Sequence, residues 1–447
     1  MMDVVFRAPR AIVTGPDGRQ VETSCAVGVV DGRIAVIGGI DDVIDATTVV
    51  DLADDEVLLP GLVDTHVHVN EPGRTEWEGF ASATAAAAAG GVTTVIDMPL
   101  NSIPSTVSTE ALAVKRDVAG PQARVNVGFW GGAVPGNVGD LRPMHDAGVF
   151  GFKCFLLHSG VDEFPPLSPV ELEAAMVEIA SFDGLLIVHA EDSRIIAESE
   201  NDGGREYADF LASRPRAAEN TAIADVIAAS TRTGCRVHIL HLSSAEAVPL
   251  VAEAKRAGVR ITAETCPHYL SFAAEEISDG ATQFKCCPPI REAGNRDALW
   301  QALSDGVIDT VVTDHSPCTA ELKRFDIGDF GAAWGGIASL QVSLSAVWSE
   351  ARRRGHGLTD VVTWMAVATS AQVGLASKGS VEVGRDADLI VFAPDQDFVV
   401  HAAELRHKNP VTAYDDRRLS GVVRSTWLAG VRVDLDGDPQ GVLLDRE

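Results

Sequence analysis

The sequence predicts an α/β protein with a central (β/α)8 TIM barrel and a small β-sandwich-like domain formed by both chain termini. Two observations support this prediction. Between residues 61 and 375, short apolar runs alternate with Ala-, Glu- and Leu-rich segments that are typical of helices. Residues 1–60 and 376–447 instead contain short strand-like stretches separated by turns. We therefore expect a barrel over 61–375 and a β domain built from 1–60 and 376–447.

The central region contains eight apolar runs that we expect to be the barrel strands. They are GLVDTHVHV (61–69), GVTTVIDM (91–98), ARVNVGFW (123–130), VFGFKCFLL (149–157), LLIVHAE (185–191), RVHILHLS (236–243), VRITAETCPHYL (259–270) and IDTVVTDHS (308–316). An open doubly wound sheet would show the same alternation of strands and helices. No glycine-rich phosphate-binding motif follows the first run. The pattern therefore favours the closed barrel.

Local signals fix several element boundaries. Ser168, followed three residues later by Glu171, predicts a capping box at the start of a helix. The alanine-rich segment before Gly90-Gly91 predicts a helix that ends at those glycines. In the N-terminal region, Asp17-Gly18 and Asp31-Gly32 indicate hairpin turns.

Composition excludes several classes of function. The chain has 447 residues, is 46% hydrophobic and carries a formal net charge of −28. Such an acidic chain without a basic patch is not expected to bind nucleic acid or an anionic membrane. The seven cysteines include no CxxC pair, and the N-terminus has no long apolar segment. These features favour free thiols and a cytoplasmic location.

Polar residues capable of binding metal lie in five of the eight runs, mostly toward their ends, where the carboxyl ends of barrel strands would converge. They are His66 and His68, Lys153, His189 and Glu191, His238 and His241, and Asp314 and His315. Two histidines at positions i and i+2 of a strand point to the same side. Any one of these residues alone could be structural, but together they predict a metal site that suits zinc, iron, manganese or cobalt.

Lys153 is unusual because it lies within an apolar run, and only 7 of the 36 basic residues are lysines. A protonated lysine has no lone pair to donate and would repel metal ions. A lysine that has reacted with CO2 becomes a carbamate, with two anionic oxygens that could bridge two ions. We therefore hypothesise a CO2-derived carbamate on Lys153 between two divalent metal ions, with zinc as the expected metal.

Six segments resemble the amidohydrolase superfamily, in the branch that includes dihydroorotases, hydantoinases (dihydropyrimidinases) and allantoinases. They are GLVDTHVHVNEPG, FKCFLLHSGVDEFP, VHAED, HILHLSS, ETCPHYL and TDHSPC. The resemblance covers essentially the whole chain. Within the branch, DMPLNSIP (97–104) and KCCPPIR (285–291) are most similar to the allantoinases. Dihydroorotases usually carry an arginine at the position of Asn70, where it pairs with a substrate carboxylate, and hydantoinases usually carry a tyrosine at the position of His158.

The resemblance implies one metal ion bound by His66, His68, carbamylated Lys153 and Asp314, and a second bound by Lys153, His189 and His241. It implies that Asp314 is the catalytic acid and base. The residues that it places near the substrate are Asn101, His158, Cys287, Ser316 and Gly335. It does not make His238, His268 or His315 ligands.

The implied activity is the hydrolytic opening of the hydantoin ring of allantoin, a step of purine catabolism. The implied assembly is a homotetramer that acts on a small molecule. A hydantoinase or dihydropyrimidinase is the nearest alternative, with the same fold and metals but a different ring as substrate. A catalytically inactive scaffold of the same fold is a third, and the six filled ligand positions argue against it.

Overall fold

The computed structural model describes residues 1–199, 201 and 203–446 and contains the eight barrel strands at the eight apolar runs. The strands are β6 (Leu62–Val67), β7 (Val92–Asp97), β8 (Asn126–Phe129) with its short continuation β9 (Gly131–Gly132), β10 (Phe152–Phe155), β11 (Leu185–His189), β12 (Arg236–Ile239), β13 (Ile261–Thr265) and β14 (Thr310–Val311). All neighbouring pairs are parallel, in the order β6-β7-β8 and β9 to β14. A parallel bridge between Val67 and His315 links the first strand to the last and closes the barrel.

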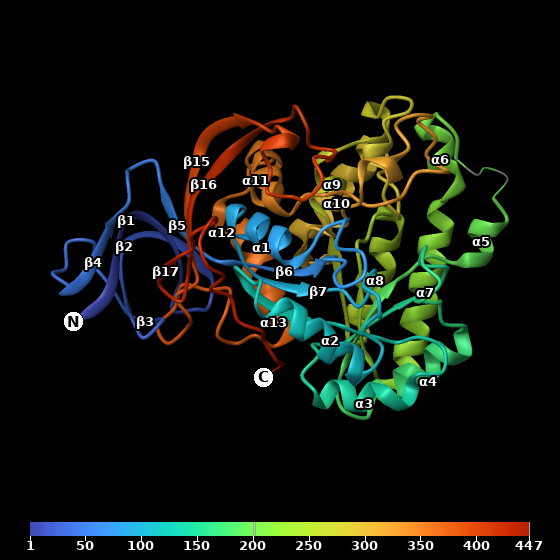
Figure 1. Ribbon diagram of the computed structural model, residues 1–447, viewed down its shortest axis with the longest axis horizontal. Helices are drawn as coiled ribbons and strands as arrows, with labels where there is room; N and C mark the ends of the chain where they lie inside the picture. Colours follow the sequence, from blue (N-terminus) through green and yellow to red (C-terminus); the bar gives the residue numbers. More distant parts are fainter. Residues whose placement is uncertain (200, 202, 447) are drawn as a thin grey trace.

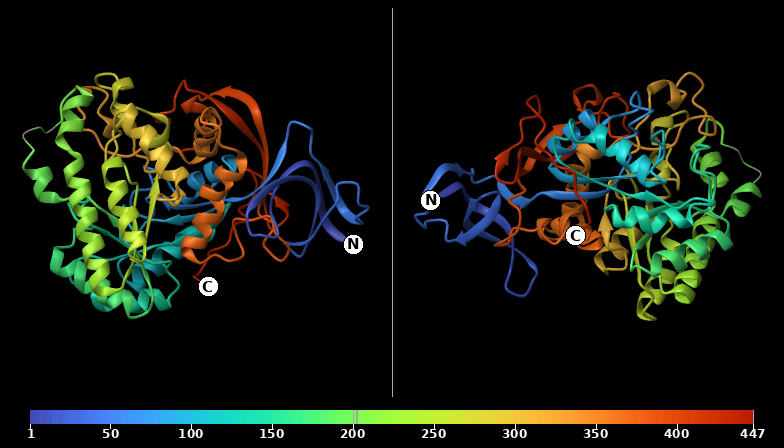
Figure 2. Two further views of the ribbon diagram at one scale, coloured as in Figure 1. Left: turned by 180° about the vertical axis from the view of Figure 1, so that it is seen from behind. Right: turned by 60° about the horizontal axis from the view of Figure 1, so that its bottom comes forward.

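Helices surround this barrel (Figures 1 and 2). They are α1 (Phe80–Ala89), α2 (Thr109–Ala119), α3 (Val138–Asp146), α4 (Pro169–Ala180), α5 (Ser193–Ala197), α6 (Tyr207–Ser213), α7 (Arg216–Thr233), α8 (Val248–Arg256), α9 (Pro267–Ser271), α10 (Ala293–Ser304), α11 (Ser343–Arg353), α12 (Leu358–Val362) and α13 (Ala368–Val373). The predicted boundaries are confirmed for α4, which begins with the Ser168–Glu171 capping box, and for α1, which ends before Gly90. In the described part of the chain, no helix is both long and apolar enough to cross a membrane.

Strands from both ends of the chain form one eight-stranded sheet beside the barrel (Figure 1). They are β1 (Met2–Thr14), β2 (Gln20–Val30), β3 (Arg33–Gly38), β4 (Ala46–Asp51), β5 (Val57–Pro60), β15 (Leu389–Val399), β16 (Arg418–Leu428) and β17 (Val431–Arg432). The two halves meet where β5 pairs with β15, and Phe6 packs edge-on against Trp427 with 4.9 Å between the ring centroids. Both hairpin turns lie at the predicted Asp-Gly pairs.

The last residues of the chain leave this sheet and return to the barrel. The amides of Gly441 and Leu444 donate to the carbonyls of Ala123 and Val127, at 2.9 and 2.8 Å. The terminal sheet has its own apolar core, which includes Val4, while the larger core lies between the barrel strands and their helices. The barrel thus contacts both the terminal sheet and the returning C-terminal segment.

Candidate metal centre

The six predicted metal ligands converge at the carboxyl end of the barrel. The imidazole of His66 lies 5.5 Å from those of His68 and His241, between ring centroids, and the rings of His189 and His241 are 4.6 Å apart. Lys153 enters the same cluster, with its Nζ 3.5 Å from Nε2 of His66. All of these side chains are buried or nearly so.

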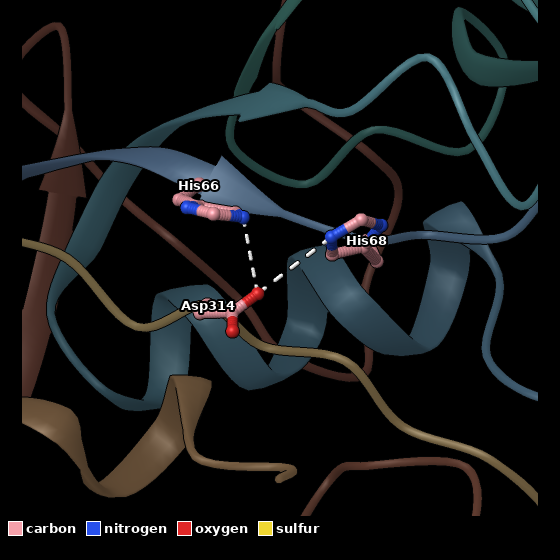
Figure 3. Close-up of side chains that lie close together, drawn as sticks. All are labelled: His66, His68 and Asp314. Carbon is pink, nitrogen blue, oxygen red and sulfur yellow. Dashed lines mark ion pairs between the residues drawn. The ribbon is translucent and has the colours of Figure 1, made fainter. Parts of the chain in front are cut away.

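Asp314 lies opposite His66 on β6 and His68 just after it (Figure 3). Its Oδ1 is 3.0 Å from Nε2 of His66 and 3.6 Å from Nε2 of His68. Burial by itself raises the pKa of this carboxyl, but the facing imidazoles of His66, His241 and His68 outweigh burial and hold the pKa well below its usual value. Asp314 is therefore an anion directed at the imidazole nitrogens.

Two of the predicted ligands have backbone conformations that are rare outside glycine. Asp314 has φ 45° and His241 has φ 35°. A positive φ is costly for a residue with a Cβ atom, and such residues cluster at functional sites because the surrounding structure holds them there. Each follows the end of a barrel strand, β14 and β12 respectively, so the chain turns sharply where the side chain enters the site.

Three of the four predicted histidine ligands have a hydrogen-bond partner beside one ring nitrogen. Nδ1 of His66 lies 2.5 Å from Oε1 of Glu264, and Nδ1 of His68 lies 3.0 Å from the carbonyl of Leu100. Nε2 of His189 lies 2.7 Å from Oε2 of Glu191. Carboxylate and carbonyl partners of this kind fix the orientation of metal-binding imidazoles. The opposite nitrogens, Nε2 of His66 and of His68, face Asp314.

One ring nitrogen at the centre lacks the hydrogen-bond partner that a buried polar atom normally has. Nδ1 of His241 is buried without a hydrogen-bond partner in the described structure. Burial also lowers the pKa of Lys153 to about 8, although Asp314 and Glu264 oppose this shift. Buried polar groups are normally satisfied, so exceptions call for an explanation such as an ion. The donor set of imidazole nitrogens and a carboxylate is one that divalent transition metals accept, so these residues fit a metal centre.

A cavity of about 230 Å³ opens directly above this cluster. All five residues predicted to lie near the substrate line it: Asn101, His158, Cys287, Ser316 and Gly335. His158 is the most exposed of them, and its Nε2 lies 3.3 Å from the carboxylate of Asp162. Sequence analysis did not select Arg214 and Lys285, which also line the cavity.

The histidines that we expected not to bind metal occupy other positions. Both ring nitrogens of His238 have partners, at 2.7 Å to Thr262 and 2.9 Å to Glu264. His315 is buried, and its Nδ1 accepts hydrogen bonds from the amides of Ser339 and Leu340. His268 is different, because neither of its ring nitrogens has a partner in the described structure.

Sequence analysis selected Glu191 as a candidate but missed Glu264 and Arg214, which also support the ligands. Glu264 contacts both His66 and His238, and Glu191 accepts from both His189 and Nη1 of Arg214, the latter at 2.6 Å. Glu264 is a carboxylate inside the seventh apolar run, which is the signal that could have identified it. Arg214 lies between two helices, and its sequence context gave no comparable signal.

Comparison with known proteins agrees with this geometry. Residues 57–433 match the model of the amidohydrolase family. The chain belongs to the amidohydrolase family, which confirms the resemblance seen in the motifs, and members of this family generally hold two metal ions.

Individual relatives and one solved structure are similar to this chain over most of their length. A protein of Streptomyces avermitilis named allantoinase is 59% identical over 100% of this chain and 99% of its own length. A Saccharomyces cerevisiae protein named allantoinase is 48% identical over 83% of this chain and 82% of its own length. Among solved structures, an L-hydantoinase (dihydropyrimidinase) from Arthrobacter aurescens matches with a TM-score of 0.92 and 30% identity, over 100% of both chains.

Proposed function

We propose that this protein is an allantoinase, which hydrolyses the hydantoin ring of allantoin to give allantoate. The observation that carries the proposal is the convergence of all six predicted metal ligands below a cavity of about 230 Å³. A relative that is 59% identical over 100% of this chain and bears the name allantoinase supports the choice of substrate. The enzyme is then a metal-dependent hydrolase of a cyclic amide.

The charges that line the cavity favour a neutral substrate. Among the described lining residues, the lysines and arginines are Lys153, Arg214 and Lys285, and Lys153 acts as a carbamate in this proposal. Arg214 is paired with Glu191, and Lys285 donates to the carbonyls of Gly331 and Ala333. At the position where dihydroorotases carry an arginine, Asn70 is buried and its Oδ1 accepts from Asn101 at 2.9 Å. No unpaired guanidinium among these residues is available for a substrate carboxylate, and allantoin has none.

The metal centre would be bound by His66, His68, Lys153, His189, His241 and Asp314. Lys153 acts as a carbamate in this proposal. Its neutral amine adds to CO2, and the resulting carbamic acid loses a proton, so that an anionic group faces the ions. The pKa of Lys153, lowered to about 8 by burial, supports the neutral amine that this reaction requires. Zinc is the expected metal, and the same ligands also accept iron, cobalt or manganese.

Two divalent ions in this position would make a bound water nucleophilic at neutral pH and polarise the carbonyl under attack. The protein supplies the proton transfer. Asp314, as an anion directed into the centre, accepts the proton of the attacking water and then delivers it to the ring nitrogen as the C–N bond breaks. Asn101, Cys287, Ser316 and Gly335 line the cavity where the ring amides would lie.

Replacement of Asp314 by asparagine tests this role. Asn keeps the size of the side chain but cannot accept and return a proton. We expect Asp314→Asn to retain its circular dichroism spectrum and most of its metal while turnover falls by about 100-fold or more. Turnover at the wild-type level in this variant would contradict the assignment.

A substrate panel on protein of measured metal content tests the proposed activity. The panel contains allantoin, hydantoin, dihydrouracil and dihydroorotate, and we expect the highest kcat/KM for allantoin. A higher kcat/KM for hydantoin or dihydrouracil would favour a hydantoinase or dihydropyrimidinase. Protein that binds no metal and hydrolyses none of the four would favour the inactive scaffold.

We infer three broader properties. The scattered cysteines without a CxxC pair support a cytoplasmic location, and the resemblance supports a homotetramer that acts in purine catabolism. Sedimentation analysis of the purified holoenzyme tests the assembly, and a monomer would contradict it.

A further inference from the structure

A second group of metal-ligand side chains lies beside the proposed centre. One ligand atom each from Cys266, His268 and Asp314 falls within 4.8 Å of the others, and all three side chains are buried. Cys266 and His268 lie at the start of α9, directly after β13, and Asp314 follows β14, so the segments after two neighbouring strands bring them together. Of the six residues in the proposed metal centre, only Asp314 belongs to this group.

His268 shows that the group is chemically incomplete. The residue is 1% exposed, and neither Nδ1 nor Nε2 has a hydrogen-bond partner in the described structure. By contrast, His238 lies on the neighbouring strand and has a partner on each nitrogen. A buried imidazole without partners lacks hydrogen bonds that such a group normally makes. The unpartnered nitrogens, beside a thiol and a carboxylate, point to a missing ligand.

We propose that Cys266, His268 and Asp314 form an additional site for a thiophilic divalent cation, such as Zn²⁺ or Cd²⁺. Thiolate, imidazole and carboxylate are the three ligand types that zinc uses in proteins, and thiolate ligation favours soft ions over Mg²⁺ or Ca²⁺. The cation takes the place of the Cys266 thiol proton, which is released to solvent, because a coordinating thiol is deprotonated. The neutral imidazole of His268 contributes a lone pair.

Occupation of this site would inhibit the enzyme. Asp314 is shared between the two groups, so an ion bound to Cys266 and His268 engages the carboxylate that the proposed function uses for proton transfer. This consequence rests on the proposed function, whereas binding of the cation does not. Excess thiophilic metal is therefore expected to reduce turnover, and removal of the weakly bound ion by a mild chelator is expected to restore it.

Titration of the holoenzyme with Cd²⁺ tests the binding. The measured signals are the thiolate-to-cadmium charge-transfer absorption and the metal content after gel filtration. The variants are Cys266→Ser and His268→Gln, each chosen to keep a polar side chain of similar size. Cys25→Ser is the matched control, because Cys25 is also buried but lies in the terminal sheet. Cys287→Ser tests the half-buried thiol that lines the cavity.

We expect the wild-type protein, Cys25→Ser and Cys287→Ser to bind one Cd²⁺ more than Cys266→Ser and to show the absorption band. His268→Gln is expected to bind this ion at least about tenfold more weakly. Equal cadmium content in the wild type and Cys266→Ser, or a band that disappears only in Cys287→Ser, would overturn the proposal. If Cys266→Ser does not fold, wild-type affinity in His268→Gln still overturns it. An incorrect substrate assignment would change the turnover data but not the cadmium band.

Discussion

Two buried lysines at the mouth of the barrel have opposite surroundings. Lys115 on α2 and Lys153 on β10 are each 1% exposed. The Nζ of Lys115 donates to Oδ2 of Asp97 at 2.7 Å and to the carbonyl of Met98 at 2.8 Å. The Nζ of Lys153 has a ring nitrogen of His66 at 3.5 Å and lies 4.9 Å from the centroid of Phe155. Lys115 thus has the acceptors that a buried ammonium requires, and Lys153 lacks them.

The other buried lysines resemble Lys115. Lys378 lies 2.9 Å from Asp386 and 2.7 Å from Asp388, and Lys323 and Lys285 donate to backbone carbonyls. Burial opposes the charge of Lys378, but the two carboxylates outweigh burial and raise its pKa. Burial also lowers the pKa of Lys285 and Lys323, and it lowers the pKa of Lys153 to about 8. A buried lysine without an acceptor is therefore a better indicator of chemistry than burial or rarity.

Removal of the Lys153 side chain should have the largest effect. The proposed carbamate is lost in Lys153→Ala, so we expect little bound metal and a loss of turnover greater than about 100-fold, the upper end of the cost of losing a residue that only supports a metal ligand. Metal analysis and initial rates measure both effects. Short carboxylic acids that bridge the ions should restore part of the activity.

The comparison with Lys115 provides the control for this experiment. Acid rescue should be specific to Lys153→Ala, because a carboxylic acid added to a Lys115 variant has no bridging position to fill. Wild-type metal content in Lys153→Ala would rule out the bridging carbamate. The contrast between Lys153 as a metal ligand and Lys115 as a structural residue would then be wrong.

Lys115→Met should reduce stability while metal ligation is retained. The change leaves Asp97 as a buried carboxylate without its cation, and breaking a buried pair in this way costs about 3–5 kcal/mol. Urea denaturation of the metal-loaded protein measures the loss. The double variant Lys115→Met/Asp97→Leu should recover part of it because no unpaired charge remains. An unchanged unfolding free energy in Lys115→Met would show that the pair is not structural.

The sequence predicted the elements whose signals are local. Eight apolar runs identified the barrel strands, and Ser168 with Glu171 identified the start of α4, because strand burial and helix capping depend on nearby residues. The six predicted ligands converge because the ends of parallel strands meet at one face of the barrel. The supporting contacts were not predictable in this way. The pairing of Glu264 with His66 joins residues 198 positions apart, and only the closed barrel brings them together.

Substitution of Arg214 tests whether residues two contacts away from the metal centre also support the ligands. We expect it to have the smallest effect on metal affinity and turnover. Its guanidinium forms an ion pair with Glu191, and Glu191 accepts a hydrogen bond from Nε2 of His189. Arg214 therefore acts on the proposed metal centre through two other side chains. Arg214→Met keeps much of the side-chain volume but leaves Glu191 with one partner fewer. We expect metal affinity or kcat to fall by about 10–100-fold, the range observed when such outer contacts are lost.

A merely structural role for Arg214 would change the unfolding free energy but leave metal affinity and kcat unchanged, so both must be measured on the same preparation. Arg214→Lys is the matched variant, because it keeps the positive charge but presents one ammonium in place of the planar guanidinium. Partial recovery in Arg214→Lys would show that charge beside Glu191 is sufficient. Equal losses in both variants would show that the guanidinium geometry orients His189. In either case the cation at position 214 acts through a carboxylate partner, as Lys115 does. Lys153 has no carboxylate partner in the described part of the chain, so its amine is available for reaction with CO2.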